Sequence, residues 1–253
     1  MVTTDATSLK LKERGRNHRP ATFKEAALLA YASAHHMLGV LPQTELERLV
    51  PKLIERPYPK GHRCYCRGDR AAYVFIVRSG LVALTNQDER GNSYATITYA
   101  PGDVLGVGAT VLEVPHEITP VAVVDTEAIL IDCALFVDLY RRYPALSHAV
   151  VAELHGILRR AEKSTIFLAR MRVPGRVSAI LLNAAGLNCA ANGTEVTVDL
   201  ALSHQEIALL VGTTRETVTR IFARLTRASI IETHGRQVRL LQPERLRKLA
   251  ELY

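Results

Sequence analysis

The sequence predicts an α+β chain in which an N-terminal antiparallel β-roll of the jelly-roll type is followed by a long helix and a C-terminal winged helix-turn-helix. Short β-rich runs alternate with glycine-bearing turns over residues 57–132. Apolar residues repeat at helical spacing over 145–171, and two capped helices precede a hairpin over 203–240. We therefore expect a basic tail (1–22), a β-roll domain (23–140), a long helix (141–171) and a winged helix-turn-helix domain (172–253).

Composition and charge restrict the class of protein. No segment has the roughly 20 consecutive apolar residues of a membrane helix, and residues 1–22 lack the apolar core of a secretory signal, so a cytoplasmic protein is expected. Four scattered cysteines are too few for a disulfide framework. The net charge of +7 lies at the chain ends: residues 170–253 carry 12 Lys and Arg against 7 Asp and Glu, while 21–169 carry 15 against 16. The C-terminal part is thus expected to meet a polyanion, and the N-terminal run to be a solvated tail.

The β-roll is predicted from four short runs rich in β-branched and aromatic residues, with breaks at glycines. The runs cover residues 73–77, 81–84, 94–99 and 121–124. Ahead of them, residues 23–38 and 43–50 have helical patterns that stop at Gly39 and Pro51.

A heptad pattern follows the β-roll. Apolar and small residues recur at alternating spacings of four and three, at Val150, Leu154, Ile157, Ala161, Ser164, Leu168 and Met171. Such a seam predicts pairing with a second helix, because a helix of this length spans on the order of 40 Å and one small roll cannot cover it. A dimerisation helix is therefore expected. Gly156 and Ser164 interrupt the apolar seam, which leaves open the alternative that the helix packs only on its own roll.

The C-terminal segment carries successive helix and strand signals. A helix is expected from Pro174 to a stop at Gly186, followed by a loop and a strand over 195–200. Ser203-His-Gln-Glu206 has the form of a capping box, so a helix should begin at His204 and end at Gly212. Thr214 can cap a second helix, whose apolar face is formed by Val218, Ile221, Phe222 and Leu225. Residues 230–233 and 237–240 then flank a His-Gly-Arg turn, as in a wing.

The outward face of the second helix carries side chains suited to reading DNA. A helix in the major groove brings its first residues to base edges, where arginine donates two hydrogen bonds to guanine and glutamate accepts one from cytosine. Arg215, Glu216 and Arg220 fall on that face. Charged residues crowd most exposed helices, but capping box, glycine turn, apolar spacing and hairpin together favour a DNA-binding element.

The stretch from Ser203 to Phe222 resembles the DNA-binding signature of the cyclic-AMP receptor protein/FNR (CRP/FNR) family, and residues 58–103 resemble that family's sensory, cyclic-nucleotide-binding-like roll. The resemblance covers residues 41–242 and implies a homodimeric bacterial transcription regulator, with RNA polymerase as a further partner if it is an activator. It places Arg215, Glu216 and Arg220 at base-reading positions with identical residue types, which implies TGTGA-like half-sites in a palindrome. It implies contacts with the DNA backbone for Ser203, His204, Gln205, Thr214, Thr217, Thr219, His234 and Arg236.

The effector region departs from this family. The family's cyclic-nucleotide cassette has a glutamate just after the equivalent of Leu105-Gly106 and an Arg-Ser or Arg-Thr pair further on. This chain has Val107-Gly108 and then Glu117-Ile118-Thr119, so only Thr119 matches. Without a guanidinium partner, cyclic AMP is not expected to bind in the usual mode. The candidate effector pocket comprises Gly106, Val107, Gly108, His116 and Thr119, although a solvent-facing loop is the simpler interpretation of His116.

Cysteines leave a second hypothesis open, a haem-, metal- or thiol-based sensor. His62, Cys64 and Cys66 alternate along one expected strand, which would put a zinc, iron or haem ligand set on one face. The alternative is that Cys64 and Cys66 only pack as small apolar side chains, as Cys133 and Cys189 are expected to do. An FNR-type iron–sulfur cluster is not expected, because residues 1–63 contain no cysteine. The sequence identifies no cofactor.

No enzymatic activity is expected. The chain contains no phosphate-binding P-loop, no nucleophile elbow and no metalloprotease motif.

Overall fold

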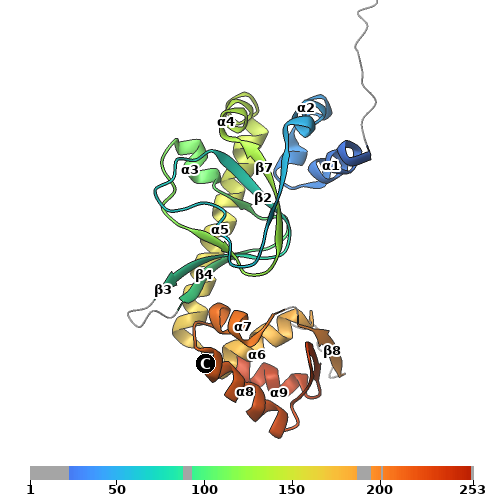
Figure 1. Cartoon of the computed structure of the whole chain (residues 1–253), viewed down its shortest axis with the longest axis vertical. Helices are drawn as coiled ribbons and strands as arrows, with labels where there is room; N and C mark the ends of the chain where they lie inside the picture. Colours follow the sequence, from blue (N-terminus) through green and yellow to red (C-terminus); the bar gives the residue numbers. More distant parts are fainter. Residues whose placement is uncertain (1–22, 88–92, 187–194, 201, 252–253) are drawn as a thin grey trace, which may run out of the picture.

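The computed structural model describes residues 23–87, 93–186, 195–200 and 202–251. The N-terminal β-roll lies at one end of the molecule, a winged helix-turn-helix at the other, and the long helix α5 (Pro144–Arg170) runs from the first towards the second (Figure 1). The expected basic tail and Cys189 lie outside the described residues.

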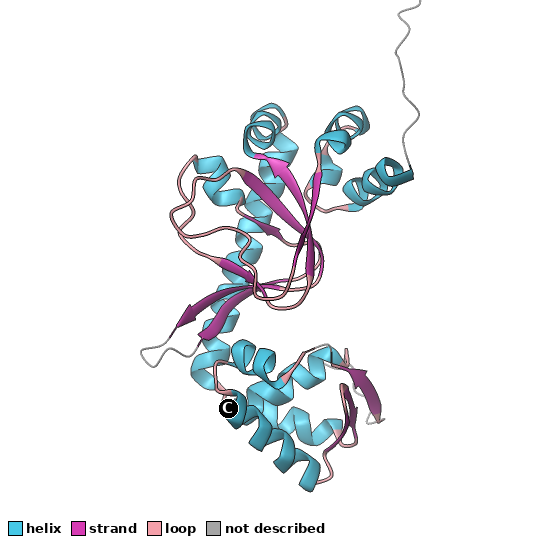
Figure 2. Cartoon of the chain, in the orientation of Figure 1, coloured by secondary structure: helices cyan, strands magenta, loops and turns pink. Residues whose placement is uncertain are grey.

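The β-roll is built from two antiparallel sheets, drawn in magenta in Figure 2. One has the order β1-β7-β2-β5 and the other the order β4-β3-β6. The strands are β1 (Ile54–Tyr58), β2 (Tyr73–Ser79), β3 (Val82–Gln87), β4 (Ser93–Tyr99), β5 (Val104–Leu105), β6 (Pro120–Ala122) and β7 (Thr126–Asp132). Val74 pairs with Ile131 and Ala83 with Thr98, and apolar side chains between the sheets form the core of the roll. The antiparallel roll expected from the glycine-punctuated runs is therefore present.

Short helices flank the roll and bury its open side. They are α1 (Phe23–Ala34), η1 (Leu38–Val40), α2 (Gln43–Leu49), η2 (Val50–Lys52), α3 (Val107–Leu112) and α4 (Cys133–Arg142). Leu28, Met37 and Leu46 pack with Ile129 and Phe136 in one cluster. The first expected helix ends at Ala34 instead of Leu38, because the chain turns there and the ring of His35 accepts backbone N–H groups of Met37 and Leu38.

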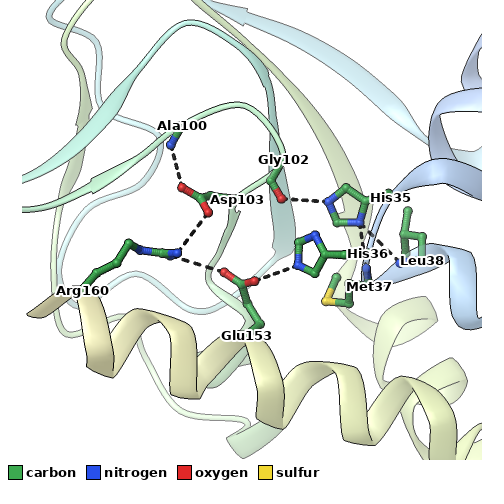
Figure 3. Close-up of polar contacts among 9 residues, drawn as sticks. All are labelled: His35, His36, Met37, Leu38, Ala100, Gly102, Asp103, Glu153 and Arg160. Carbon is green, nitrogen blue, oxygen red and sulfur yellow. Dashed lines mark hydrogen bonds and ion pairs between the residues drawn. The ribbon is translucent and has the colours of Figure 1, made fainter. Parts of the chain in front are cut away.

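A chain of polar contacts ties these helices to α5 and to the β4–β5 turn (Figure 3). Glu153, buried on α5, lies 2.8 Å from His36 Nε2 and 3.5 Å from Arg160, whose other guanidinium nitrogen is 3.2 Å from Asp103. His35 Nδ1 accepts from the backbone, so Nε2 carries the proton and donates to Gly102 O at 2.9 Å. Burial lowers the pKa of His35, which favours this neutral form.

The two stripes of α5 have different surroundings, and this corrects the predicted seam. Val150 is only 1% exposed and packs in the core of its own chain, and Ile157 packs against the β-roll, so neither faces outward. The large exposed apolar side chains of α5 are Val151, Leu154, Leu158 and Ile166. Val151, Leu154 and Leu158 keep the three–four spacing. The outward seam is therefore shifted by one residue from the predicted one at two of its positions.

The C-terminal domain joins α6 (Val173–Ala184), α7 (His204–Val211), α8 (Arg215–Arg227) and α9 (Pro243–Glu251) to a small sheet. This sheet has the order β8-β10-β9, with β8 (Val196–Asp199), β9 (Ile231–His234) and β10 (Gln237–Leu240). Its core includes Val177, Ile207 and Val218, all at most 1% exposed. None of the described helices is long and apolar enough to cross a membrane.

The two ends of the molecule touch through α7. Leu209 and Leu210 of α7 pack against Ala83, Ala95 and Val123 of the roll. Beside this apolar contact, Lys60 of the β1–β2 connection forms an ion pair with Glu206 of α7. The helix-turn-helix is thus seated on the lower edge of the β-roll (Figure 1).

Candidate nucleic-acid interface

The first helix of the helix-turn-helix begins with the predicted capping box. Ser203 Oγ accepts from the backbone N–H of Glu206 at 3.4 Å, and the Glu206 carboxylate accepts from the backbone N–H of Ser203. The helix ends at Gly212, whose φ of +64° is one that side-chain-bearing residues rarely adopt. Burial alone would raise the pKa of Glu206, but hydrogen bonds from Lys60 and Ser203 bring it below its usual value. Glu206 is therefore a carboxylate that serves both the cap and the contact with the β-roll.

The second helix presents the predicted readers to solvent. Thr214 caps α8 by accepting from the N–H of Thr217 at 3.3 Å. Its buried face consists of Val218, Ile221, Phe222 and Leu225, as the spacing predicts. Arg215, Glu216, Thr219 and Arg220 are exposed on the other face. Amphipathic packing thus fixes which side of α8 points outward, and it is the side with the charged readers.

Local contacts set the charge state and direction of these readers. Hydrogen bonds from its own backbone N–H and from the Thr214 hydroxyl lower the pKa of Glu216, so it stays an acceptor at neutral pH. Arg220 donates to Thr217 Oγ1 at 3.2 Å, and the Thr219 hydroxyl donates to Arg215 O at 3.0 Å. The Thr217 contact is neutral and the Thr219 contact is made to the Arg215 backbone, so both guanidinium groups can still take an anionic or base-edge acceptor.

His204 connects the two helices. Its Nδ1 lies 3.0 Å from Thr219 Oγ1, and its ring centroid lies 4.5 Å from that of Phe222. Burial, with the nearby Arg215 charge, lowers the pKa of His204. The lowered pKa favours the neutral side chain in the free protein, and a neighbouring anion would favour the protonated form.

The wing is a two-stranded hairpin closed by Gly235, with φ +62°. His234 Nε2 lies 3.1 Å from Glu232, and the Arg236 side chain is exposed at the turn. Leu200 donates its N–H to Arg236 O at 2.9 Å, which joins the wing to the strand before α7.

The side chains expected at the DNA backbone divide into two groups. Ser203, His204, Thr219 and Arg236 line a cleft of about 1000 Å³, and Lys60 and Asp125 of the β-roll line its other wall. The remaining four, Gln205, Thr214, Thr217 and His234, are not among the residues that line this cleft. The contribution of Lys60 was not foreseen from the sequence, since its partner Glu206 lies 146 positions further along the chain.

A smaller cavity of about 310 Å³ lies where the resemblance places the effector pocket. Gly106, Val107, Gly108 and His116 line it, together with Tyr65, Tyr99, Leu154 and Ile157. Thr119 is not among these residues, and its hydroxyl instead accepts from the Arg67 N–H at 2.9 Å.

His116 corrects the solvent-facing interpretation. Its ring stacks on that of Tyr65 with centroids 3.7 Å apart and an angle of 16°, and only 4% of the residue is exposed. Burial lowers the pKa of His116, although Asp69 opposes this shift. His116 is therefore a neutral, buried polar group at the wall of the cavity.

The structure does not support the proposed metal face. Residues 62–66 form no strand apart from a single bridge at Arg63, so His62, Cys64 and Cys66 do not share a strand face. His62 is exposed and bonds to Pro59 O, whereas Cys64 packs against the roll core. No group of three or more His, Cys, Asp or Glu side chains among the described residues is placed to hold a metal ion. Burial raises the pKa of Cys64 to about 12, which disfavours a reactive thiolate.

Two family models match this chain, and two similar curated proteins are described as transcriptional regulators. A cyclic nucleotide-binding domain model matches residues 55–143, and a Crp-like helix-turn-helix model matches residues 175–249. The chain is 27% identical to the transcriptional regulatory protein Btr of Bordetella pertussis over 83% of this chain and 86% of that protein. It is 26% identical to the CRP-like cAMP-activated global transcriptional regulator of Mycobacterium tuberculosis, over 84% and 94%. The structure of FixK2 from Bradyrhizobium japonicum superposes with a TM-score of 0.65 at 27% identity, covering 78% of this chain and 96% of FixK2.

Proposed function

Since this chain belongs to the CRP/FNR family and is a DNA-binding transcription regulator of that type, we propose that it reads a palindrome with TGTGA-like half-sites through Arg215, Glu216 and Arg220. The observation that carries this proposal is the exposure of all three side chains on the first turn and a half of α8, while the opposite face is buried.

The chemistry of these side chains matches the proposed half-site. An arginine that donates to O6 and N7 of a guanine, and a carboxylate that accepts from cytosine N4, each discriminate against the wrong base by about 1–3 kcal/mol. Arg236 and Ser203 contact the DNA backbone, so they add affinity without sequence preference.

A second copy of the chain is the partner that the palindrome requires. The exposed apolar side chains Val151, Leu154 and Leu158 repeat along α5 at three–four spacing, which suits pairing with the same helix of another protomer. Pairing of two α5 helices would set the distance between two copies of α8. Such an interface also removes from water a stripe that is exposed in the single chain.

The cavity of the β-roll supports an input other than cyclic AMP bound by its phosphate. Among the described residues that line the cavity there is no lysine or arginine, and Glu117 adds a negative charge. A phosphate buried there would have no bidentate partner and would face a carboxylate. We therefore expect no heat of cyclic AMP binding in calorimetry of the purified protein.

The test of base reading is a fluorescence-anisotropy titration at fixed salt, on a TGTGA palindrome and on a duplex with scrambled half-sites. The wild type should bind the palindrome at least about 10-fold more tightly, and Arg215→Ala or Arg220→Ala should each reduce this preference by the contribution of one base contact, about 1–3 kcal/mol. Arg227→Ala is the matched control, because this exposed arginine lies in the last turn of the same helix. It should change the affinity for both duplexes equally. Equal wild-type binding to the two duplexes would refute the proposal.

A further inference from the structure

A second cationic surface lies on the other side of α8 from the cleft. It is a groove of about 750 Å³ between the first turn of α6, the flank of α8 and the helix α9. Its charged lining residues are all basic: Arg172, Arg220, Arg224, Arg245 and Lys248. No aspartate or glutamate is among the described residues that line it.

The packing of α9 on α6 brings these charges together. Leu246 is fully buried, which turns Arg245 and Lys248 to the exposed side of α9. At the crossing, a Cβ on Gly175 would lie 2.6 Å from Leu249 O, so only glycine allows this close approach. The groove thus depends on one glycine in the first turn of α6.

Several other cations of the same domain form ion pairs with carboxylates. Arg239 pairs with Glu195 and Glu232, and Arg247 pairs with Glu244. By contrast, no ion pair joins Arg220, Arg224, Arg245 or Lys248 to a carboxylate in the described part of the chain. Within the described residues, Arg220 donates to the neutral Thr217 hydroxyl and Arg245 to the neutral side-chain amide of Gln242.

The first turn of α6 adds a favourable field. Val173, Pro174 and Gly175 line the groove, and the N-cap residue Arg172 makes no side-chain capping bond to this turn. The unsatisfied N–H groups of a helix start carry partial positive charge and attract phosphate. The helix start therefore adds to the attraction exerted by the side chains.

We propose that this groove binds phosphodiester groups of the same duplex that α8 reads, and so forms a second backbone contact beside the reading face. This inference rests on the proposed function. The groove shares Thr217 and Arg220 with the reading helix, and Arg224 lies one turn, about 6 Å, further along it. An extended polyanion that already contacts Arg220 therefore passes beside the other cations, whereas a small anion would occupy only a few of them.

The salt dependence of binding gives the expected size of the effect. Each phosphate neutralised contributes about 0.9 to the slope of log K against log salt. Arg224, Arg245 and Lys248 are six cations in a dimer, so their loss should reduce the slope by up to about 5. Base preference should not change, because phosphate contacts carry no sequence information.

The experiment compares the wild type with the triple variant Arg224→Gln, Arg245→Gln, Lys248→Gln. The control is the triple variant Lys52→Gln, Arg63→Gln, Arg67→Gln, which removes the same charge from exposed sites of the β-roll. Affinity for the TGTGA palindrome and for the scrambled duplex is measured between 50 and 200 mM salt. Thermal melting confirms that both variants are folded. Duplexes with a neutral methylphosphonate at one backbone position at a time then locate the contact.

The groove variant should lose affinity equally for both duplexes and show a shallower salt slope than the control. It should also become insensitive to some neutral linkages that weaken the wild type. A groove variant whose slope and linkage profile equal those of the control would overturn the inference. Failure of the proposed function looks different, because the wild type itself would then not distinguish the two duplexes.

Discussion

The ion pair between Lys60 and Glu206 gives a sharp test of how the helix-turn-helix packs on the β-roll. Glu206 is 8% exposed at its side chain and Lys60 is 55% exposed, so the pair is half screened by solvent. Exposed pairs contribute about 0.2–1 kcal/mol, and one buried carboxylate moves this pair to the upper end of that range. We expect a coupling free energy of about 1 kcal/mol between the two side chains.

A double-mutant cycle isolates this coupling. Lys60→Met removes the ion pair alone, whereas Glu206→Gln also weakens the capping box, which adds roughly 1 kcal/mol to its own cost. Local stability of α7 is measured by hydrogen exchange of its backbone amides in both single variants and in the double variant. The coupling is the part of the two effects that fails to add.

A matched control and the pH dependence sharpen the cycle. Arg141 and Glu113, both more than 60% exposed, form an ion pair on the β-roll, and their cycle should give at most a few tenths of a kcal/mol. The folded-state pKa of Glu206 is lowered, so its stabilisation is present above the unfolded-state value and is lost as pH falls through the folded-state value. A Lys60–Glu206 coupling no larger than that of the control pair would refute this seating of α7 on the β-roll.

Three further predictions concern DNA affinity, folding and assembly. Because the pKa of His204 is lowered in the free protein, contact with a DNA phosphate should add a proton, so DNA affinity should rise as pH falls from about 7.5 to 6. DNA titrations at several pH values should show that His204→Asn lacks this part of the pH dependence. An unchanged pH dependence in the variant would exclude the contact. Gly175→Ala should lower the free energy of unfolding by about 1–3 kcal/mol in urea titrations, because the added Cβ would lie 2.6 Å from a backbone oxygen. Gly156→Ala is the control and should be neutral or stabilising, because its Cβ would lie 3.9 Å from the end of the Arg160 side chain. Equal losses of stability in the two variants would contradict the close crossing of α6 and α9. Leu154→Asp should dissociate the proposed dimer in analytical ultracentrifugation, and an unchanged sedimentation coefficient would exclude this face of α5 from the proposed interface.

The helix-turn-helix was predictable to the residue because its boundaries are encoded locally. Ser203, Gly212 and Thr214 each act on backbone groups within four positions of themselves, and the structure has α7 and α8 where these residues predict them. The proposed base-reading face follows from the same local information. Once the apolar side of α8 is buried, the position of Arg215 and Arg220 on the opposite side is determined by the helical period.

Several elements whose environment depends on distant contacts were not predicted. Strand β7 lies between β1 and β2 and is buried on both faces along most of its length, so it lacks the alternation that marks a half-buried strand. The helices α4 and α9 were missed as well. Arg245 and Lys248 line the groove because α9 crosses α6, and this crossing could not be predicted from the sequence.

The seam of α5 and the environment of His116 show a second limit of the sequence. Two adjacent stripes of α5 both fit a heptad, and burial of Val150 in its own chain decides between them. The sequence predicts an exposed loop position for His116, because the Tyr65 ring on which it stacks lies 51 positions earlier and cannot be recognised as its partner from the sequence. Periodicity identifies an amphipathic helix, but only tertiary packing shows which apolar stripe is left for a partner.

The most direct measurement of the central claim tests whether the Arg215 side chain reads one particular base pair. The affinities of the wild type and of Arg215→Ala are measured at one salt concentration for the TGTGA palindrome and for palindromes in which one G·C pair of each half-site is replaced by A·T. We expect one replacement to weaken the wild type at least about 10-fold and to leave Arg215→Ala unaffected, because the side chain that read that pair is gone. If every replacement weakens wild type and variant by the same factor, Arg215 does not read bases and the proposed reading face of α8 is contradicted.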